Sequence, residues 1–255
     1  MLVVKLVLAP GLLLAASLLA RRAGEAFGGW LVALPLTSAP VAFVVMHEQG
    51  RAFAAVTATS MMAATSSQVI FALCYRVAAS RGPWPATGAA LVGFVASTML
   101  LITVKPSFAL SALWAGAILI LAVRYTRARA LPSGLTTSHQ QRPTWDLPLR
   151  MFIGGMVVLT ITMAAPVLGP HLTGLLSPLP VLAAVLTIFA HHQAGIHAAI
   201  ATIDGLVVGL ISPAVFFAVT ATLVESFATW AFVVATAAAL VVQVCVRPRT
   251  ALTAQ

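Results

Sequence analysis

The sequence contains very little charge for its length. Only 7% of its 255 residues are charged, whereas soluble domains carry about 25% charged residues. Because so few charges cannot cover a surface in water, the composition excludes a soluble enzyme or binding domain and predicts a surface covered by lipid. Acidic residues are the scarcest, and there are five: Glu25, Glu48, Asp146, Asp204 and Glu225.

The sequence also lacks the residue patterns of the common enzyme classes. It contains no HExxH zinc motif, no GxSxG nucleophile elbow, no P-loop and no Rossmann fingerprint. The two cysteines, Cys74 and Cys245, form no motif and indicate no disulfide framework. We therefore expect neither an enzymatic activity nor a cofactor.

Three histidines in one region, His191, His192 and His197, suggest a metal site at first sight. Their spacings of one, five and six residues do not place three ligands on one helical face, and no cysteine or carboxylate joins them. We interpret them as interfacial histidines near a helix end and expect no bound metal.

Long apolar runs make up most of the chain. Hydrophobic residues account for 61% of it, and the mean hydropathy is +1.05. A helix needs about 20 apolar residues to cross a hydrocarbon core of ~30 Å. We expect the first such run to remain a helix rather than a signal peptide, because Arg21 and Arg22 stand where a cleavage site would be. The sequence therefore predicts an all-α integral membrane protein with nine transmembrane helices, at residues 3–20, 28–46, 53–75, 84–103, 107–124, 150–168, 172–191, 197–222 and 227–246.

The basic residues are distributed unevenly between the ends of these helices. The net charge is +9, but the basic residues lie between apolar runs rather than in one patch, which argues against nucleic-acid binding. The side of the membrane that holds the long linker, residues 125–149, receives eleven of the fourteen basic residues. The positive-inside rule then predicts a multi-pass protein of the bacterial inner membrane, with its N-terminus outside and its C-terminus in the cytoplasm.

The two halves of the chain share a pattern of glycine, proline and histidine. Shifting the sequence by 145 positions places GGWLVALP on TGLLSPLP and HEQG on HQAG. Chance explains this common order poorly, although two apolar helical stretches often match by accident. The shift aligns Gly24 with Gly169, Gly29 with Gly174, Pro35 with Pro180, His47 with His192, Gly50 with Gly195, Thr57 with Thr202, Ser67 with Ser212 and Phe71 with Phe216.

This repeat predicts the organisation of the chain. Residues 1–104 and 150–255 form two four-helix units, residues 105–124 form a linking transmembrane helix, and residues 125–149 form a cytoplasmic loop. Because the two copies begin five helices apart, they must have opposite orientations in the membrane. Inverted repeats are typical of secondary transporters, whose substrate sites lie near the midplane between the repeats.

The string TGLLSPLPVLAAVLTIFAHHQAG resembles the GlpM-type small membrane proteins of bacteria, which have four helices and a similar progression of glycine, proline, histidine and glycine. Each half of the chain is similar to one such unit, and the second half is the closer of the two. The resemblance implies a place in the drug/metabolite transporter superfamily and a transport role. Small multidrug exporters of that superfamily carry a glutamate in their first helix. Neither residues 3–20 nor residues 150–168 contain an acid, which argues against proton-coupled export of cationic drugs by that chemistry.

Asp204 is the most informative single residue. It lies about eight residues, or roughly 12 Å, into the predicted helix 197–222. An unpaired carboxylate in hydrocarbon costs a few kcal/mol or more, so it should face the protein interior or water. We expect it in a water-reachable cavity between the halves, with His197 on nearly the same helical face. The alternative is that the helix enters the membrane only at Gly205, which would make Asp204 an interfacial N-cap.

Other polar side chains lie in the predicted helix 53–75. The hydroxyl groups of Thr57, Thr59 and Ser60 can bond to their own backbone and serve packing alone. The amide of Gln68 needs a partner across the bundle or a polar substrate. By the repeat, this helix is the counterpart of the helix that carries Asp204. The predicted substrate or ion pathway consists of Asp204, His197, Gln68, Thr57, Thr59 and Ser60.

Prolines interrupt two of the predicted helices. Pro35 and Pro40 lie in one of them, and Pro178 and Pro180 lie in the other. Each proline removes a backbone donor and bends or breaks a helix. Broken membrane helices often line cavities, where protein or water can satisfy the freed carbonyl groups. The alternative is a simple packing kink.

These features favour a small secondary transporter that exports or flips a neutral, amphipathic or lipid-linked metabolite. The alternative is a non-transporting membrane subunit of an envelope or polysaccharide assembly. The expected partners are the lipid bilayer, a small-molecule or lipid-linked substrate and, as one option, a second copy of the chain in a homodimer. No nucleic acid is expected among them.

Overall fold

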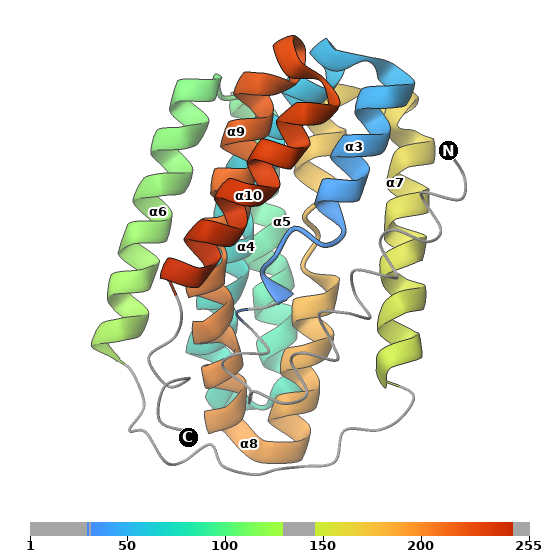
Figure 1. The fold of residues 1–255 in the computed structure, drawn as a ribbon. Coiled ribbons are helices and arrows are strands. Elements are labelled where there is room, and N and C mark those ends of the chain that lie inside the picture. Colours follow the sequence, from blue (N-terminus) through green and yellow to red (C-terminus); the bar gives the residue numbers. More distant parts are fainter. Residues whose placement is uncertain (1–29, 31, 130–145, 247–255) are drawn as a thin grey trace.

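The computed structural model describes residues 30, 32–129 and 146–246, and every regular element in these ranges is a helix (Figure 1). Long helices run side by side and form an upright bundle. The elements are α3 (Ser38–Gln49), α4 (Arg51–Ala78), the 3-10 turn η1 (Ala79–Arg81), α5 (Pro83–Val104), α6 (Phe108–Ala128), α7 (Asp146–Leu176), α8 (Val181–Gly209), α9 (Ile211–Phe227) and α10 (Thr229–Cys245).

Four glycines mark sharp changes of chain direction. Gly50 and Gly82 lie between helices, and Gly169 and Gly195 interrupt α7 and α8. All four have a positive φ between 72° and 97°, which side chains with a Cβ rarely adopt. At Gly169 the chain turns at the upper end of Figure 1, and at Gly195 it turns at the lower end. The chain therefore runs up and down the bundle repeatedly.

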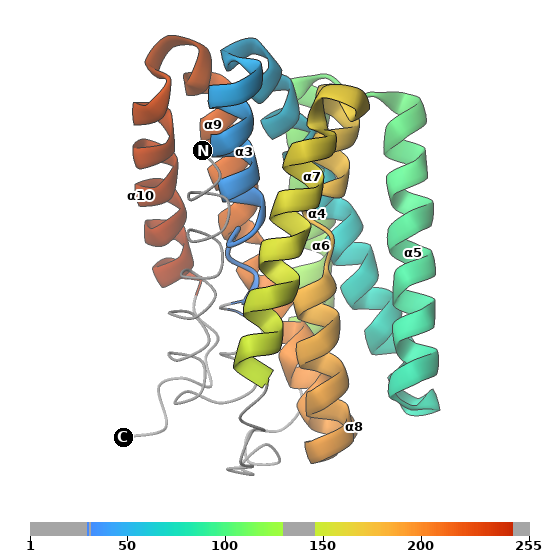
Figure 2. The same ribbon diagram turned by 90° about the vertical axis from the view of Figure 1, so that its right-hand side faces the viewer.

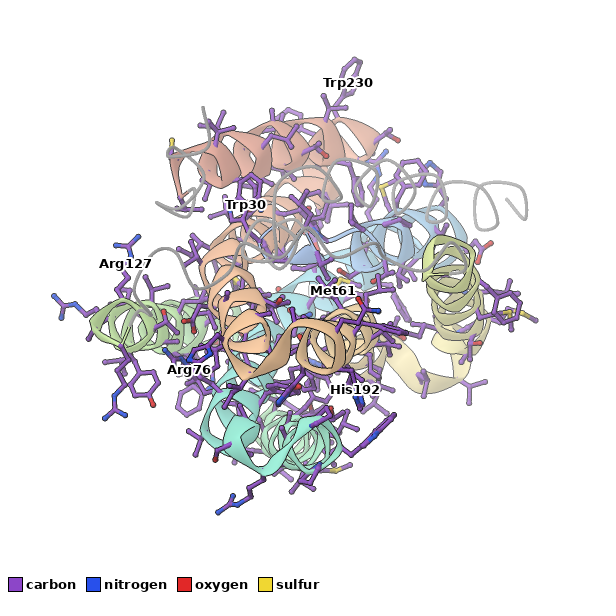
Figure 3. All side chains as sticks on the ribbon, turned by 90° about the horizontal axis from the view of Figure 1, so that it is seen from below. Trp30, Met61, Arg76, Arg127, His192 and Trp230 are labelled. Carbon is purple, nitrogen blue, oxygen red and sulfur yellow. The ribbon has the colours of Figure 1, made fainter. Side chains whose placement is uncertain are left out.

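α4 is the central helix of the bundle. It packs against α3, α5, α6, α7, α8 and α9. Large side chains such as Met61, Phe71 and Tyr75 are fully buried along it. Viewed from the lower end, Met61 lies near the middle of the bundle, whereas Trp230 and Arg127 project away from it (Figure 3).

The outer helices present apolar side chains outward. Val92 on α5, Leu113 and Leu121 on α6 and Trp230 on α10 are each at least 66% exposed. Patches of this kind are rare on soluble monomers and common on surfaces that contact lipid. Within the described residues, four helical stretches are long and apolar enough to cross a membrane: Arg51–Arg81, Pro83–Val104, Phe108–Ala128 and Leu159–Phe227.

The sequence predicts nine spans, and the structure confirms only that several helices are long and apolar enough to cross a membrane. The first predicted span, residues 3–20, lies outside the described residues. α3 is only 12 residues long because its helix is interrupted before Ser38, and α10 has 17 residues. The stretch from Leu159 to Phe227 contains 69 residues, far more than one crossing needs, because short breaks rather than polar loops divide it.

Two of the breaks lie near mid-height of the bundle. Residues 34–37 precede α3, and residues 177–180 separate α7 from α8. α3 rises from the first break, and the first part of α8 descends from the second (Figures 1 and 2). The N-terminal ends of both helices thus lie inside the bundle rather than at its surface.

Candidate functional site at the two helix breaks

The two breaks face each other across a small cavity of about 30 Å³. Residues 32–38 line it from one side, and residues 178–180 with Leu182 and Ala183 line it from the other. Pro35 and Pro180, which the repeat aligned, are both among its lining residues. Proline at these positions removes backbone donors, so the helices cannot continue through the breaks without loss of hydrogen bonds.

Gln68 connects the central helix α4 to the second break. Its side-chain Nε2 donates a hydrogen bond of 2.8 Å to the carbonyl oxygen of Pro178, which belongs to the second break. Gln68 also lines the cavity. The amide thus satisfies a carbonyl group that the break leaves free, and it finds the cross-bundle partner that its polarity requires.

The helix ends at the cavity leave backbone donors unused. The first backbone bond of α3 runs from Ala39 N to Pro35 O at 2.9 Å, and that of α8 runs from Ala184 N to Pro180 O at 2.8 Å. The N–H groups of Ser38 and Ala183, one residue earlier in each helix, have no helical acceptor. Thr37 precedes α3, but its side chain makes no cap bond. Ser38 is 4% exposed and lines the cavity, and its hydroxyl makes no hydrogen bond within the described part of the chain.

Pro40 was expected to break a helix, and this expectation is wrong. Pro40 lies within α3, two residues after the helix begins at Ser38. Proline is tolerated in the first turn of a helix, and α3 continues through Pro40 to Gln49. The break lies before it, at residues 34–37.

The hydroxyl residues of α4 lie elsewhere, nearer the upper end of the bundle. The Ser60 hydroxyl contacts His171 Nδ1 at 3.2 Å, and Thr59 donates to Ala55 O at 3.0 Å. Thr57 is fully buried, and its hydroxyl oxygen has no partner among the described residues. Thr57 and Ser60 pack near Gly174 of α7, and none of the three residues lines the cavity at the breaks.

Asp204 is neither an interfacial N-cap nor a neighbour of Thr57, Thr59 and Ser60. It lies within the helical part of α8 that follows Gly195 and forms a two-pronged ion pair with Arg76 near the lower end of α4. Arg76 Nε donates to Asp204 Oδ1 at 2.9 Å, and Arg76 Nη2 donates to Asp204 Oδ2 at 3.2 Å. Ser60 and Arg76 are 16 residues apart on α4, about 24 Å along its axis. The carboxylate and the hydroxyl residues therefore cannot share one site.

Other polar contacts surround this ion pair. Arg76 also donates to the Arg129 carbonyl oxygen at 2.7 Å, and its guanidinium lies 5.7 Å from the ring centre of Tyr125. In the sequence analysis Arg76 counted only as one of the basic residues that set the topology. Its position within an apolar helix, like that of Asp204, was the signal that could have indicated an ion pair. His197, which was expected near Asp204, is exposed and makes no hydrogen bond to it.

Two of the three clustered histidines contact aromatic residues. The Tyr75 hydroxyl and His191 Nδ1 are 3.0 Å apart, and the rings of Trp84 and His192 lie 5.9 Å apart. Within the described residues no group of three histidine, cysteine, aspartate or glutamate side chains could hold a metal ion.

A larger hollow of about 500 Å³ lies between α6 and α9. Its lining is apolar except for Arg124 and Arg127 near the end of α6. Because α6 carries many exposed apolar side chains, this hollow opens on the surface that we assign to lipid. The cavity at the helix breaks is the better candidate site, since it combines enclosure with polar groups.

Comparison with models of protein families, with curated proteins and with solved structures found no match to this chain. The candidate site therefore has to be interpreted from its own geometry.

Proposed function

We propose that the protein is a small secondary transporter of the bacterial inner membrane, and that its substrate binds at the cavity between the two helix breaks. The observation that carries the proposal is the convergence of the two breaks on one cavity at mid-height. Interrupted helices whose ends meet near the midplane are the usual substrate sites of secondary transporters. An interruption that served packing alone would not need a polar cavity or the amide of Gln68.

The proposal includes nine spans arranged as two inverted four-helix units. Similar backbone conformations at one aligned pair support it: Gly50 has φ 94° and ψ 170°, and Gly195 has φ 81° and ψ −175°. The aligned residues Ser67 and Ser212 are both fully buried. The resemblance to GlpM-type proteins stays a prediction.

The charge distribution supports the proposed topology. Among the described residues, Arg76, Arg81 and the arginines at the end of α6 lie toward the lower end of the bundle. Arg51 and Lys105 lie at turns of the upper end, where Glu48 and Glu225 are also found. The lower end would therefore face the cytoplasm.

Transport by the purified protein in liposomes tests the proposal. We expect uptake or efflux of at least one compound from a metabolite mixture, and a rate about tenfold lower in the Gln68→Ala variant. Loss of the Gln68 amide leaves the Pro178 carbonyl without its donor, at a cost of about 1–3 kcal/mol in the site. Gln49→Ala, at the end of α3 and away from the cavity, is the matched control and should transport normally.

Two results would contradict the proposal. A folded and inserted protein that moves no compound would favour the non-transporting subunit. Transport that is equally fast in the Gln68→Ala and Gln49→Ala variants would place the substrate site elsewhere.

A further inference from the structure

Two helices, α3 and α8, begin at the cavity between the helix breaks. Among the described residues that line it, none is ionisable. The N-terminus of a helix carries a partial charge of about +0.5 elementary charge. The N-termini of α3 and α8, helical segments that begin at Ser38 and Val181, both lie at this cavity, and each places a partial positive charge there. The C-terminal end of α7 at Leu176 lies beside the second break and offsets part of this charge.

Three hydrogen-bond donors of Ser38 and Ala183 at the cavity have no acceptor among the described residues. The backbone N–H groups of Ser38 and Ala183 lack helical acceptors, as described above. Ser38 is 4% exposed and lines the cavity, and its hydroxyl makes no hydrogen bond within the described residues. A buried hydroxyl without a partner is unfavourable unless a ligand or water completes it.

We infer that this cavity binds a small anionic group, either a carboxylate of the substrate or a small monovalent anion, between the N-termini of α3 and α8. The inference deepens the transport function proposed above and rests on it for its biological role. It replaces the expectation of a neutral substrate, which followed from the scarcity of charged side chains at the midplane. Helix N-termini supply positive potential through backbone N–H groups, so a count of charged side chains in the sequence does not reveal an anion site of this kind.

The size of the cavity limits the bound group. A volume of about 30 Å³ is larger than the ~10–15 Å³ that one water molecule requires. It suits a carboxylate or a halide rather than a phosphate ester with a bulky substituent. An apolar remainder of the substrate would have to extend past Leu36 or Leu179, which also line the cavity.

The test measures anion binding by the full-length purified protein in detergent. Thermal unfolding is followed at constant sodium concentration while gluconate is replaced by formate in one series and by chloride in another. We expect a saturable rise in the melting temperature with formate or with chloride. A rise in the formate series alone would indicate a carboxylate, and a rise in both would indicate a general anion site.

Variants of Ser38 connect the binding to this cavity. Ser38→Ala should weaken the apparent affinity about tenfold, because a hydrogen bond to a charged group is lost. Ser111→Ala is the matched control, since Ser111 is also a buried serine in the first turn of a helix, and it should bind as the unaltered protein does.

Ser38→Asp places a tethered carboxylate at the helix ends. We expect it to abolish the anion response while remaining at least as stable as Ser38→Asn, because the two N-termini stabilise the negative charge. A Ser38→Asp protein that is far less stable than Ser38→Asn would show that the cavity is not electropositive and would overturn the inference. Absence of a saturable anion response in the unaltered protein would overturn it as well.

Failure of this inference is distinguishable from failure of the proposed function. Ser38-dependent anion binding without transport in liposomes would leave the site standing and remove the transport function. Transport of a neutral compound without any anion response would leave transport standing and remove the anion site.

Discussion

The ion pair between Arg76 and Asp204 gives the lower half of the bundle a fixed polar contact. The side chains are 8% and 22% exposed, so both charges are largely removed from water. Pairing makes such burial tolerable, because an isolated charge would lose its hydration without compensation. Asp204 was expected to be a free carboxylate in a transport pathway. In the structure it is instead the ion-pair partner of Arg76.

Removing either partner should destabilise the protein more than removing both. Asp204→Asn or Arg76→Gln leaves one uncompensated charge, and we expect each to cost about 3 kcal/mol of unfolding free energy, near the lower end of the range for buried pairs. The double variant Asp204→Asn/Arg76→Gln should recover at least half of that loss. Melting temperatures in detergent measure these effects. Additive losses in the double variant would show that the two charges do not interact.

At the scale of elements, glycines let the half-helices near the breaks approach their neighbours closely. A Cβ at Gly174 would collide with the carbonyl oxygen of Thr57 and with the Cβ of Ser60 on α4. A Cβ at Gly209 of α8 would lie 2.5 Å from the Ala33 Cβ and 2.6 Å from the Trp30 carbonyl oxygen. The segments on either side of the cavity are thus held by backbone contact. Trp30 receives a further bond of 2.7 Å from Gln243 of α10.

Alanine at these close contacts should be destabilising. We expect Gly174→Ala and Gly209→Ala to lower the unfolding free energy by about 1–3 kcal/mol, because the neighbouring backbone must move apart. Gly88→Ala and Gly116→Ala are matched controls, since a Cβ at either helical position meets nothing within 4 Å. They should be neutral or stabilising by up to about 1 kcal/mol, because alanine favours helix more than glycine does. Equal effects at all four positions would contradict the close packing.

At the scale of the whole molecule, the two ends of the bundle should lie on opposite sides of the membrane. Arg81 is exposed in η1, the turn between α4 and α5 at the lower end of the bundle (Figure 1). His47 is exposed near the end of α3, at the upper end. The two positions therefore report on the two faces, and the sequence contains two native thiols, Cys74 and Cys245, that have to be removed first.

Labelling with a membrane-impermeant maleimide measures this topology. In a protein without the two native thiols, an Arg81→Cys variant should react in inside-out vesicles and not in intact spheroplasts. A His47→Cys variant without the two native thiols should show the reverse pattern and serves as the control. Labelling of the Arg81→Cys variant from the outside would overturn the orientation deduced from the arginines.

The class of the protein and the approximate positions of its helices could be predicted from the sequence alone. Both depend on local properties, since the length of an apolar run is set by the thickness of the bilayer and not by the rest of the fold. The breaks at Pro35 and Pro180 were predictable for the same reason, because proline acts on its own helix. Gln68 could be recognised as needing a partner, since its amide lies in an apolar helix.

Only the tertiary structure decided which of these features meet. Arg76 and Asp204 are 128 residues apart, and their pairing depends on how α4 and α8 are rotated about their axes. The same holds for Gln68 and Pro178, and for the burial of Ser38, which no sequence pattern marked. The positive ends of α3 and α8 belong to the backbone, which is the same for every residue type. Their convergence on one cavity is a property of helix packing that the side-chain sequence does not record.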